Sequence, residues 1–316
     1  MTREQYDAVD AANYSTIKHF YTNPDKIGVS FTNEGMTKGT LIELGFQQGL
    51  DVFEDSVHIM GTNVEDAIKL VATEVFKRYG NNYNDDVINE TRLDLNSYSN
   101  YKTETYLKKF KDTGGKDYIE ELSLAEGKQV INADLYQMCK DAIVYLNTNF
   151  SEMHAYIKQE AFVEEIVYGE FEGLAKCMLD FRQDNHIVDM KFTSNDPRFF
   201  MGSDYFSYMY YVQETLYKVI VANKLKKPTN YRFLVVTDKF WNPYTRQIYA
   251  TYIDNRAVTT PINELYKMIG DRVVPTLEHL LLGYKEWKMT GDDKPSSLPY
   301  AFHNRKTLVY NGNYTI

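Results

Sequence analysis

Residues 179–194 read LDFRQDNHIVDMKFTS, a pattern that predicts two strands joined by a short turn. Apolar residues alternate on both sides of the polar RQDN segment, as they do in strands that pair through a tight connection. Successive side chains of a strand point to opposite faces, so Asp189 and Lys191 share one face of the second strand. If the two strands pair through the turn, Asp180 of the first strand can lie on the same face.

This arrangement of acids and a lysine favours metal-assisted chemistry. Two carboxylates that lie close together repel each other unless a cation or a proton lies between them. Mg²⁺ prefers carboxylate and water oxygens, and Mn²⁺ can take its place. With Asp180 and Asp189 as metal ligands, Lys191 would orient the water that attacks a phosphodiester. D-x-K is also common by chance, and in that interpretation the three are ordinary residues at strand ends and on a solvated strand face.

The rest of the chain predicts a mixed α/β fold around this hairpin. The apolar residues keep a helical spacing through the first half and begin to alternate near residue 162. Helices are predicted over 15–22, about 37–53, 63–80, 133–149, about 203–225 and 261–288, the last broken at Pro275. Strands are predicted over 161–171, 173–181, 186–193, 231–239 and 246–254, with connections at FEG (171–173) and RQDN (182–185).

We expect a single domain over residues 1–316. Its first part, about 1–160, is mainly helical, about 161–290 form a sheet-containing catalytic core, and 290–316 form a tail. No apolar run approaches the roughly 18 residues that span a bilayer, and the N-terminus is too polar for a secretory signal. We therefore expect no membrane partner and a cytoplasmic location, which is the host cytoplasm if a phage encodes the protein.

Composition narrows the classes of partner and metal site. Lys plus Arg number 35 against 44 Asp plus Glu, so the formal charge of -9 argues against a surface that coats nucleic acid indiscriminately. A local basic groove is still compatible with that charge. Cys139 and Cys177 lie far apart and form no CxxC motif, so a metal would take oxygen or histidine ligands.

A wider pattern surrounds the acid pair. Asp180 follows a glycine by seven positions, D-x-K comes nine residues later, and a helix with Y-x-x-Q-x-x-x-Y follows. This combination resembles the RecE/RecB-like branch of the PD-(D/E)XK nuclease superfamily, which contains phage-type recombination exonucleases. The matching residues are Gly173, Asp180, Asp189, Lys191, Thr193, Tyr210 or Tyr211, Gln213 and Tyr217. YSTIKHFYTNPDK and FLVVTDKFWNP are similar to the first helix and the closing hairpin of that branch.

The resemblance implies a restriction-endonuclease-like core, in which helices flank a mixed central sheet. It implies a magnesium-dependent exonuclease that acts on duplex DNA ends in phage-type recombination or repair, with Gln213 supporting the site or the strand. A single-strand annealing protein and a second copy of the chain are further candidate partners. The alternatives are an endonuclease or nickase with the same core, and a nuclease-like protein that binds DNA or has a structural role without cleaving it.

Glu43 marks a departure from the family pattern. The family usually carries G-T-x-x-H on an early helix, and its histidine joins the metal, whereas this chain reads GTLIE and has Glu43 at that position. Other PD-(D/E)XK nucleases use a glutamate from an early helix. Glu43 is therefore either a third metal ligand beside Asp180 and Asp189 or a solvated helix residue.

Candidate DNA contacts lie near the predicted site. Two basic clusters could meet phosphates, and we favour the one after the glutamine helix over the one at residues 108–116 because it adjoins the site in sequence. The predicted set is Lys176, Thr193, Tyr217, Lys224, Lys226 and Lys227. A charge run is usually a solvated face, and a buried tyrosine is usually a core residue.

Overall fold

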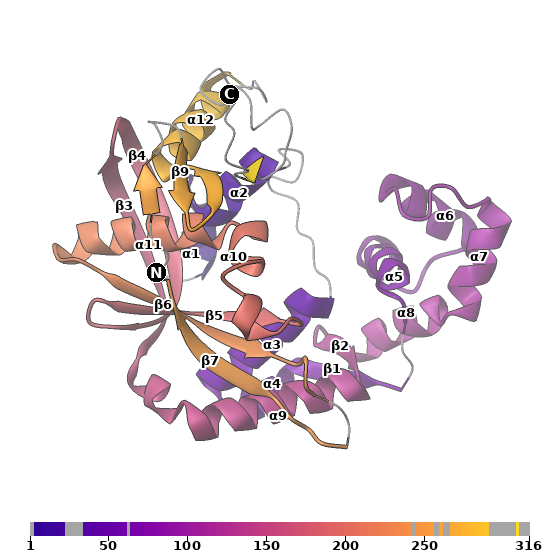
Figure 1. The fold of residues 1–316 in the computed structure, drawn as a ribbon. Helices are drawn as coiled ribbons and strands as arrows, with labels where there is room; N and C mark the ends of the chain where they lie inside the picture. Colours follow the sequence, from indigo (N-terminus) through magenta and orange to yellow (C-terminus); the bar gives the residue numbers. More distant parts are fainter. Residues whose placement is uncertain are drawn as a thin grey trace. The chain divides into compact units, whose positions relative to one another are not determined.

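The computed structural model describes residues 3–22, 34–61, 64–241, 244–255, 259–261, 266–290 and 308–309. Its contacts divide the chain into two units, shown in Figure 1. One, the sheet unit, comprises residues 1–31, 152–237 and 250–316. The other, the helical unit, comprises residues 32–151 and 238–249. This division differs from the predicted boundary near residue 160, because Ile17 and Phe20 of the N-terminal segment belong to the core of the sheet unit.

The sheet unit contains a five-stranded mixed sheet with the strand order β3-β4-β5-β6-β7. β3 pairs with β4 and β4 with β5 in antiparallel fashion, whereas β5 and β6 are parallel, so the predicted mixed α/β fold is confirmed at this level. The strands are β3 (Ile157–Tyr168), β4 (Phe171–Gln183), β5 (His186–Thr193), β6 (Asn230–Thr237) and β7 (Tyr249–Asp254). The first three match the predicted meander. The turn between β3 and β4 lies at Gly169 and Glu170 rather than at the predicted FEG, because Gly169 adopts a φ of 59° that favours glycine.

Two helices connect the parallel pair β5 and β6. They are α10 (Asp204–Ser207) and α11 (Tyr210–Leu225), after a short 3₁₀ turn, η3 (Pro197–Phe199). The sequence predicts one helix over about 203–225, but Met209 has a φ of 57°, which interrupts the helical hydrogen bonds between the two segments. α11 packs on β3 and β4, as Figure 1 shows, and its buried face joins the main core of the unit.

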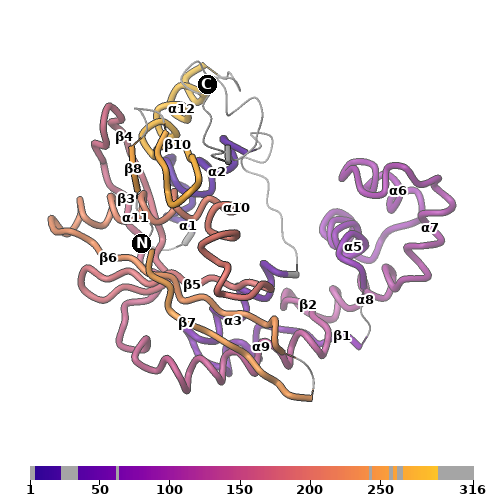
Figure 2. Tube along the Cα trace, in the orientation of Figure 1, coloured from indigo at the N-terminus to yellow at the C-terminus, as the bar shows by residue number. Residues whose placement is uncertain are grey.

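The predicted C-terminal helix over 261–288 is wrong in its first half. β8 (Thr259–Pro261), β9 (Tyr266–Ile269) and β10 (Arg272–Pro275) form a small antiparallel sheet with β11 (Leu308–Val309), and only α12 (Leu277–Thr290) is helical. Gly270 has a φ of 62°, so a tight turn replaces the helix between β9 and β10 (Figure 2). Apolar residues of this hairpin and of α12 contribute to one core with α2 (Tyr14–Thr22) and α11.

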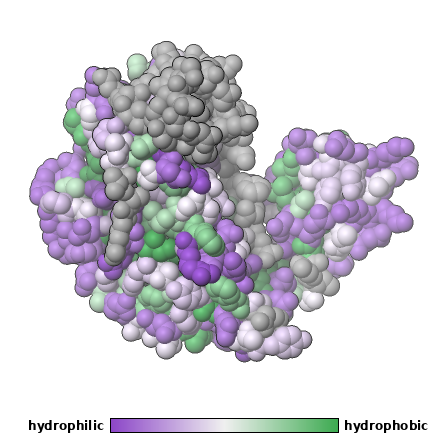
Figure 3. Space-filling view, in the orientation of Figure 1, coloured by the Kyte–Doolittle hydropathy of each residue, from purple (hydrophilic) through white to green (hydrophobic). Residues whose placement is uncertain are grey.

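The helical unit has its own apolar cluster, which α5 to α8 build. Its elements are α3 (Glu34–Gln48), α4 (Leu50–Ser56), β1 (Val57–Met60), α5 (Asp66–Tyr79), α6 (Asp85–Asp94), α7 (Thr103–Asp112), α8 (Gly115–Leu124), β2 (Gln129–Asn132) and α9 (Ala133–Asn149). The predicted helix over 133–149 is confirmed as α9. The predicted helix over 37–53 is divided, because Gly49 has a φ of 119° between α3 and α4. Hydrophilic residues cover much of the face of α5 to α8 in Figure 3.

The parallel pair β1 and β2 was not predicted, because four-residue strands are too short to show alternation. The remaining short elements are α1 (Arg3–Ala8) and the 3₁₀ turn η2 (Ser151–Ala155). Within the described part of the chain, no helix is both long and apolar enough to cross a membrane.

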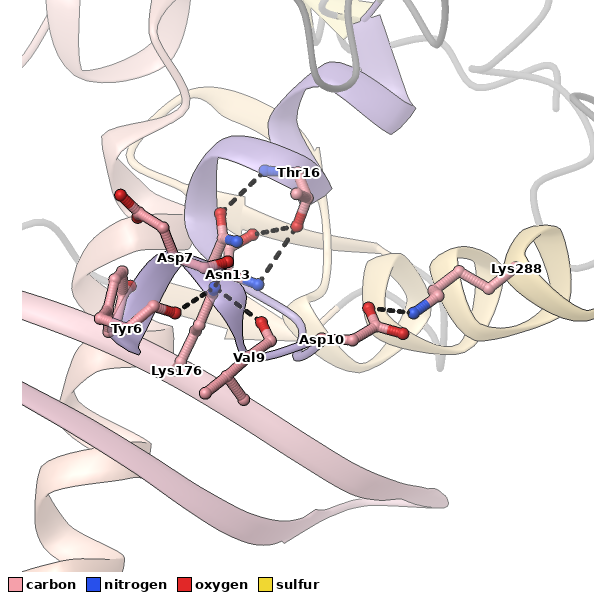
Figure 4. A network of polar contacts seen from close by, with 8 residues as sticks. All are labelled: Tyr6, Asp7, Val9, Asp10, Asn13, Thr16, Lys176 and Lys288. Carbon is pink, nitrogen blue, oxygen red and sulfur yellow. Dashed lines mark hydrogen bonds and ion pairs between the residues drawn. The ribbon is translucent and has the colours of Figure 1, made fainter. Parts of the chain in front are cut away.

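Lys176 fastens the N-terminal segment to the sheet (Figure 4). Its ammonium group donates hydrogen bonds to the backbone carbonyls of Tyr6 and Val9, both at 2.8 Å, and to that of Asp7 at 3.3 Å. The Tyr6 ring lies 4.6 Å from the same nitrogen. Ala12 continues this attachment, because it exchanges backbone hydrogen bonds with β4. Lys176, a residue that is 5% exposed, thus supplies donors to carbonyls in the last turn of α1 and just after its end, where a helix needs donors from outside itself.

Replacing Lys176 by Met should destabilise the protein by about 1–3 kcal/mol, because the apolar chain is kept while several charge-assisted hydrogen bonds are lost. Urea unfolding would measure the free energy, and limited proteolysis should show faster cleavage near α1. Lys285→Met is the matched control, since the exposed Lys285 gives a single hydrogen bond to the Glu172 carbonyl at 3.0 Å. Equal stabilities of the two variants would contradict this role of Lys176.

Candidate functional site

The two aspartates lie where β4 and β5 separate. The register of these strands runs from Gln183↔His186 to Phe181↔Val188, and the next positions along it are Asp180 and Asp189. Beyond that point β5 continues beside β6, and backbone hydrogen bonds from Ala12 take over the edge of β4. We call this point, where β4 and β5 diverge after Asp180 and Asp189, the fork. It leaves the two acids opposite each other at the end of the paired region, on one face as the alternation predicts.

The Asp180 side chain replaces a backbone carbonyl of β4 as the hydrogen-bond acceptor at the fork. Its Oδ2 accepts a hydrogen bond of 2.7 Å from the backbone N–H of Met190, which no longer pairs with β4. The carboxylate therefore satisfies a strand group that the divergence of the strands exposes. The hydrogen bond orients the half-buried side chain of Asp180 toward the Asp189-Met190-Lys191 segment.

Asp189 is a buried acid, 1% exposed, so its charge requires partners inside the protein. Gln213 of α11 donates a hydrogen bond from Nε2 to Oδ1 at 2.8 Å, and Lys191 forms an ion pair with Oδ2. Beyond that ion pair, Oδ2 accepts no hydrogen bond from the described residues. One oxygen is thus fixed by a neutral amide, and the other faces only a cation.

The Lys191 ammonium lies between the acids and an aromatic ring. It is 5.0 Å from the centre of the Tyr210 ring and 3.4 Å from the Met190 carbonyl oxygen. Burial by itself lowers the pKa of Lys191, but the charges of Asp189 and Asp180 outweigh burial and raise the pKa above its usual value. The group is therefore a positive charge at neutral pH.

The donor set at the fork suits a hard divalent cation. Asp180 and Asp189 provide carboxylate oxygens, and the Met190 carbonyl adds a neutral oxygen on the same segment. The buried Oδ2 of Asp189, paired only with an ammonium, is the kind of oxygen that Mg²⁺ or Mn²⁺ binds. In the described part of the chain, no group of three or more His, Cys, Asp or Glu side chains gathers around one point.

Glu43 lies on α3 in the helical unit, and its Oε1 accepts a hydrogen bond of 2.8 Å from Gln47 one turn later. The acid pair belongs to the sheet unit. The predicted third ligand thus belongs to the other unit of the chain, and its participation stays a prediction.

Three of the predicted DNA contacts are internal residues. Lys176 uses its ammonium on the carbonyls beside α1, and Thr193 is 6% exposed and donates its hydroxyl to Asp204 at 2.6 Å. Tyr217 is 8% exposed and packs against Tyr231 in the core, where burial raises the pKa of its phenol. We therefore withdraw these three from the DNA-contact set, because their polar groups or rings are already used in folding.

The three remaining lysines lie at the surface around the C-terminal end of α11. Lys224 forms an ion pair of 2.8 Å with Glu164, and Lys227 forms one with Asp184. Lys226 donates a hydrogen bond of 3.2 Å to Asn223. Lys224 follows Gln213 by eleven residues, which is about 16 Å along a helix. Acidic partners reduce the net positive charge of this cluster, and its role as a DNA contact stays a prediction.

The sequence did not point to the aromatic residues beside Lys191 as a group. Tyr14 and Tyr208 both lie close to Tyr210, with ring centres 6.4 Å and 5.6 Å away. Burial raises the pKa of Tyr210 to about 12, so it is a neutral phenol beside the acid pair. Tyr14 comes from a helix almost two hundred residues earlier, and no local spacing signals its contact with α11.

Comparison with known proteins adds little to this site. No family model matches the chain, and no curated protein matches it. Among solved structures, a protein from Eubacterium rectale described as "Putative exonuclease" aligns with a TM-score of 0.45 and 11% sequence identity, over 80% of this chain and 77% of that one. That TM-score is too low to assign a shared fold.

Substitutions of Asp189 and Lys191 should have coupled effects on the free energy of unfolding. Lys191→Met alone leaves a buried carboxylate with only Gln213, and Asp189→Asn alone leaves a largely buried ammonium with less compensation. The double variant removes both charges, so it should lose about 1–3 kcal/mol less stability than the sum of the single variants. Urea unfolding of the four proteins measures this coupling, and strict additivity would show that the two groups do not interact.

Proposed function

We propose that the protein is a metal-dependent nuclease that hydrolyses phosphodiester bonds in DNA. The observation that carries the proposal is the geometry of the fork, where two opposed carboxylates share one face with an ammonium group. The resemblance of the D-x(8)-D-x-K pattern and its glutamine helix to PD-(D/E)XK nucleases supports the same conclusion.

The charges at the fork suit a phosphodiester substrate. The two carboxylates with the one ammonium amount to a formal charge of minus one, and a divalent cation would change it to plus one. A phosphodiester carries one negative charge and gains more at the reacting oxygens in the transition state, so a net positive group stabilises that state. When bound, Mg²⁺ would lower the pKa of a water molecule and neutralise phosphate charge.

The residues of the chain have separable roles in this proposal. Asp180 and Asp189 would hold the metal, and Gln213 keeps the Asp189 carboxylate in one orientation through Oδ1. Lys191 would orient the attacking water by hydrogen bonding, since its ammonium lies beside the same carboxylate and over the Tyr210 ring. Glu43 joins the set as the proposed third ligand.

The resemblance to PD-(D/E)XK nucleases supports a more specific substrate and mode of cleavage. We propose exonucleolytic digestion of duplex DNA from its ends, in phage-type recombination or repair, with a single-strand annealing protein or a second copy of the chain as candidate partners. An endonuclease or nickase with the same residues is the second candidate, because the fork geometry acts on any phosphodiester that reaches it.

Purified protein should degrade linear duplex DNA with Mg²⁺ or Mn²⁺ and not with excess chelator. Lys191→Ala should lower the rate by about 10²-fold or more, because a positioned group in the chemical step typically contributes that much. Asp180→Asn should also remove activity, while Lys285→Ala should cleave like the wild type. Circular dichroism and thermal unfolding establish that each variant is folded.

Two substrates separate the candidate activities. A linear duplex that is degraded while a covalently closed circle stays intact supports the exonuclease, and nicking or linearisation of the circle supports the endonuclease. Metal-independent cleavage, or equal cleavage by folded Lys191→Ala and wild type, would contradict the proposed function.

A further inference from the structure

A cluster of three tyrosines connects Lys191 to a second lysine in the sheet unit. The Lys191 ammonium lies over the Tyr210 ring, and the Tyr208 ring packs beside Tyr210 with 5.6 Å between the ring centres. The ammonium of Lys18 lies 5.2 Å from the centre of the Tyr208 ring and 5.8 Å from that of Tyr14. The contacts therefore run without interruption from Lys18 through aromatic rings to the acid pair.

The elements fix these side chains in place. Tyr14 and Lys18 are four residues apart on α2, so they share one helix face, while Ile17 and Phe20 are buried in the core and anchor the helix there. The Tyr14 hydroxyl donates a hydrogen bond to the backbone carbonyl of Tyr208. The contact joins α2 to the connection between α10 and α11, two segments far apart in the chain.

Tyr208 differs from its neighbours because about half of the residue is open to solvent. It is 48% exposed, whereas Tyr211 beside it in sequence is 4% exposed. Met209, with a φ of 57°, separates α10 from α11 at this point and lets Tyr208 project outward while Tyr211 enters the core. Tyr208 is not among the residues that build the core of the sheet unit, so the exposed part of its ring is available to a partner from solvent.

We propose that Lys18 and Tyr208 form a binding site for an unpaired nucleotide of the DNA strand that enters the fork, with Lys18 on a phosphate and the Tyr208 ring stacked on a base. The proposal rests on the proposed nuclease function, because it places the site next to Lys191 on the path of the scissile strand. Stacking on a tyrosine needs no particular base, so the site takes single-stranded DNA of any sequence.

The chemistry favours an unpaired strand over an intact duplex. Inside a duplex both faces of each base are covered by neighbouring bases, so an aromatic side chain can stack only on a base that has left the helix or lies at an end. A lysine ammonium is a point charge that meets phosphate without reading sequence. Together they recognise the frayed terminus of a strand.

Fluorescence anisotropy with a short labelled single-stranded oligonucleotide in excess chelator tests the site without cleavage. Tyr208→Ala should raise the Kd about tenfold, the size expected for one lost base-stacking contact. Tyr208→Phe keeps the ring and should bind like the wild type. Lys18→Ala should raise the Kd and reduce the steepness of the plot of log K against log salt concentration by about one, the value expected for one lost phosphate contact. Lys285→Ala should change neither quantity.

Lys285 is a fair control because it lies over Phe171, nine residues along β4 from Asp180, which is about 30 Å in an extended strand. Tyr208→Ala also keeps the backbone carbonyl that accepts from Tyr14, so this variant should fold like the wild type. Circular dichroism checks that expectation.

Affinities of Tyr208→Ala and Lys18→Ala equal to that of the wild type would overturn the site, as would a wild type that binds no oligonucleotide. The two proposals fail separately. Cleavage by the wild type together with unchanged binding by both variants would remove only this site, and weakened binding by the variants without any cleavage by the wild type would remove only the nuclease function.

Discussion

The buried carboxylate of Asp189 is the constraint on which the sheet unit depends. A carboxylate that is 1% exposed is unstable unless its charge is compensated, and this one is compensated from two directions. Lys191 supplies an ammonium from the same strand, and Gln213 supplies an amide from α11. The position of α11 on the sheet is therefore tied to the chemistry of the fork as well as to apolar packing.

Irregular features of the backbone gather around this acid. The strands β4 and β5 separate at Asp180 and Asp189, and Asp180 satisfies the Met190 N–H that the separation leaves without a strand partner. Met209 leaves the helical conformation directly before Tyr210, the first residue of α11, whose ring lies against the Lys191 ammonium. Lys176 and the N-terminal segment occupy the edge of β4 that β5 no longer covers.

The spacing of apolar residues predicted the elements whose conformation depends mainly on neighbouring residues. The alternation around RQDN predicted β4, β5 and the shared face of Asp180 and Asp189, and helical spacing predicted α9 with its bounds. The predicted helix over 261–288 is wrong in its first half, because the chain turns at Gly270, where φ is 62°. The spacing of apolar residues does not reveal such a turn. Thr193 and Lys176 were assigned to DNA because residue type alone does not distinguish an exposed polar group from one with an internal partner.

The most direct measurement is anomalous X-ray scattering from crystals of the protein soaked in Mn²⁺. The account predicts one strong peak at the fork, bound by carboxylate oxygens of both Asp180 and Asp189, with the Lys191 ammonium displaced from direct contact with Oδ2. It also predicts that Asp180→Asn crystals lose the peak. A fork in which Mn²⁺ does not bind, with Lys191 still paired to Asp189 at saturating metal, would contradict the account and leave the ion pair as a purely structural feature.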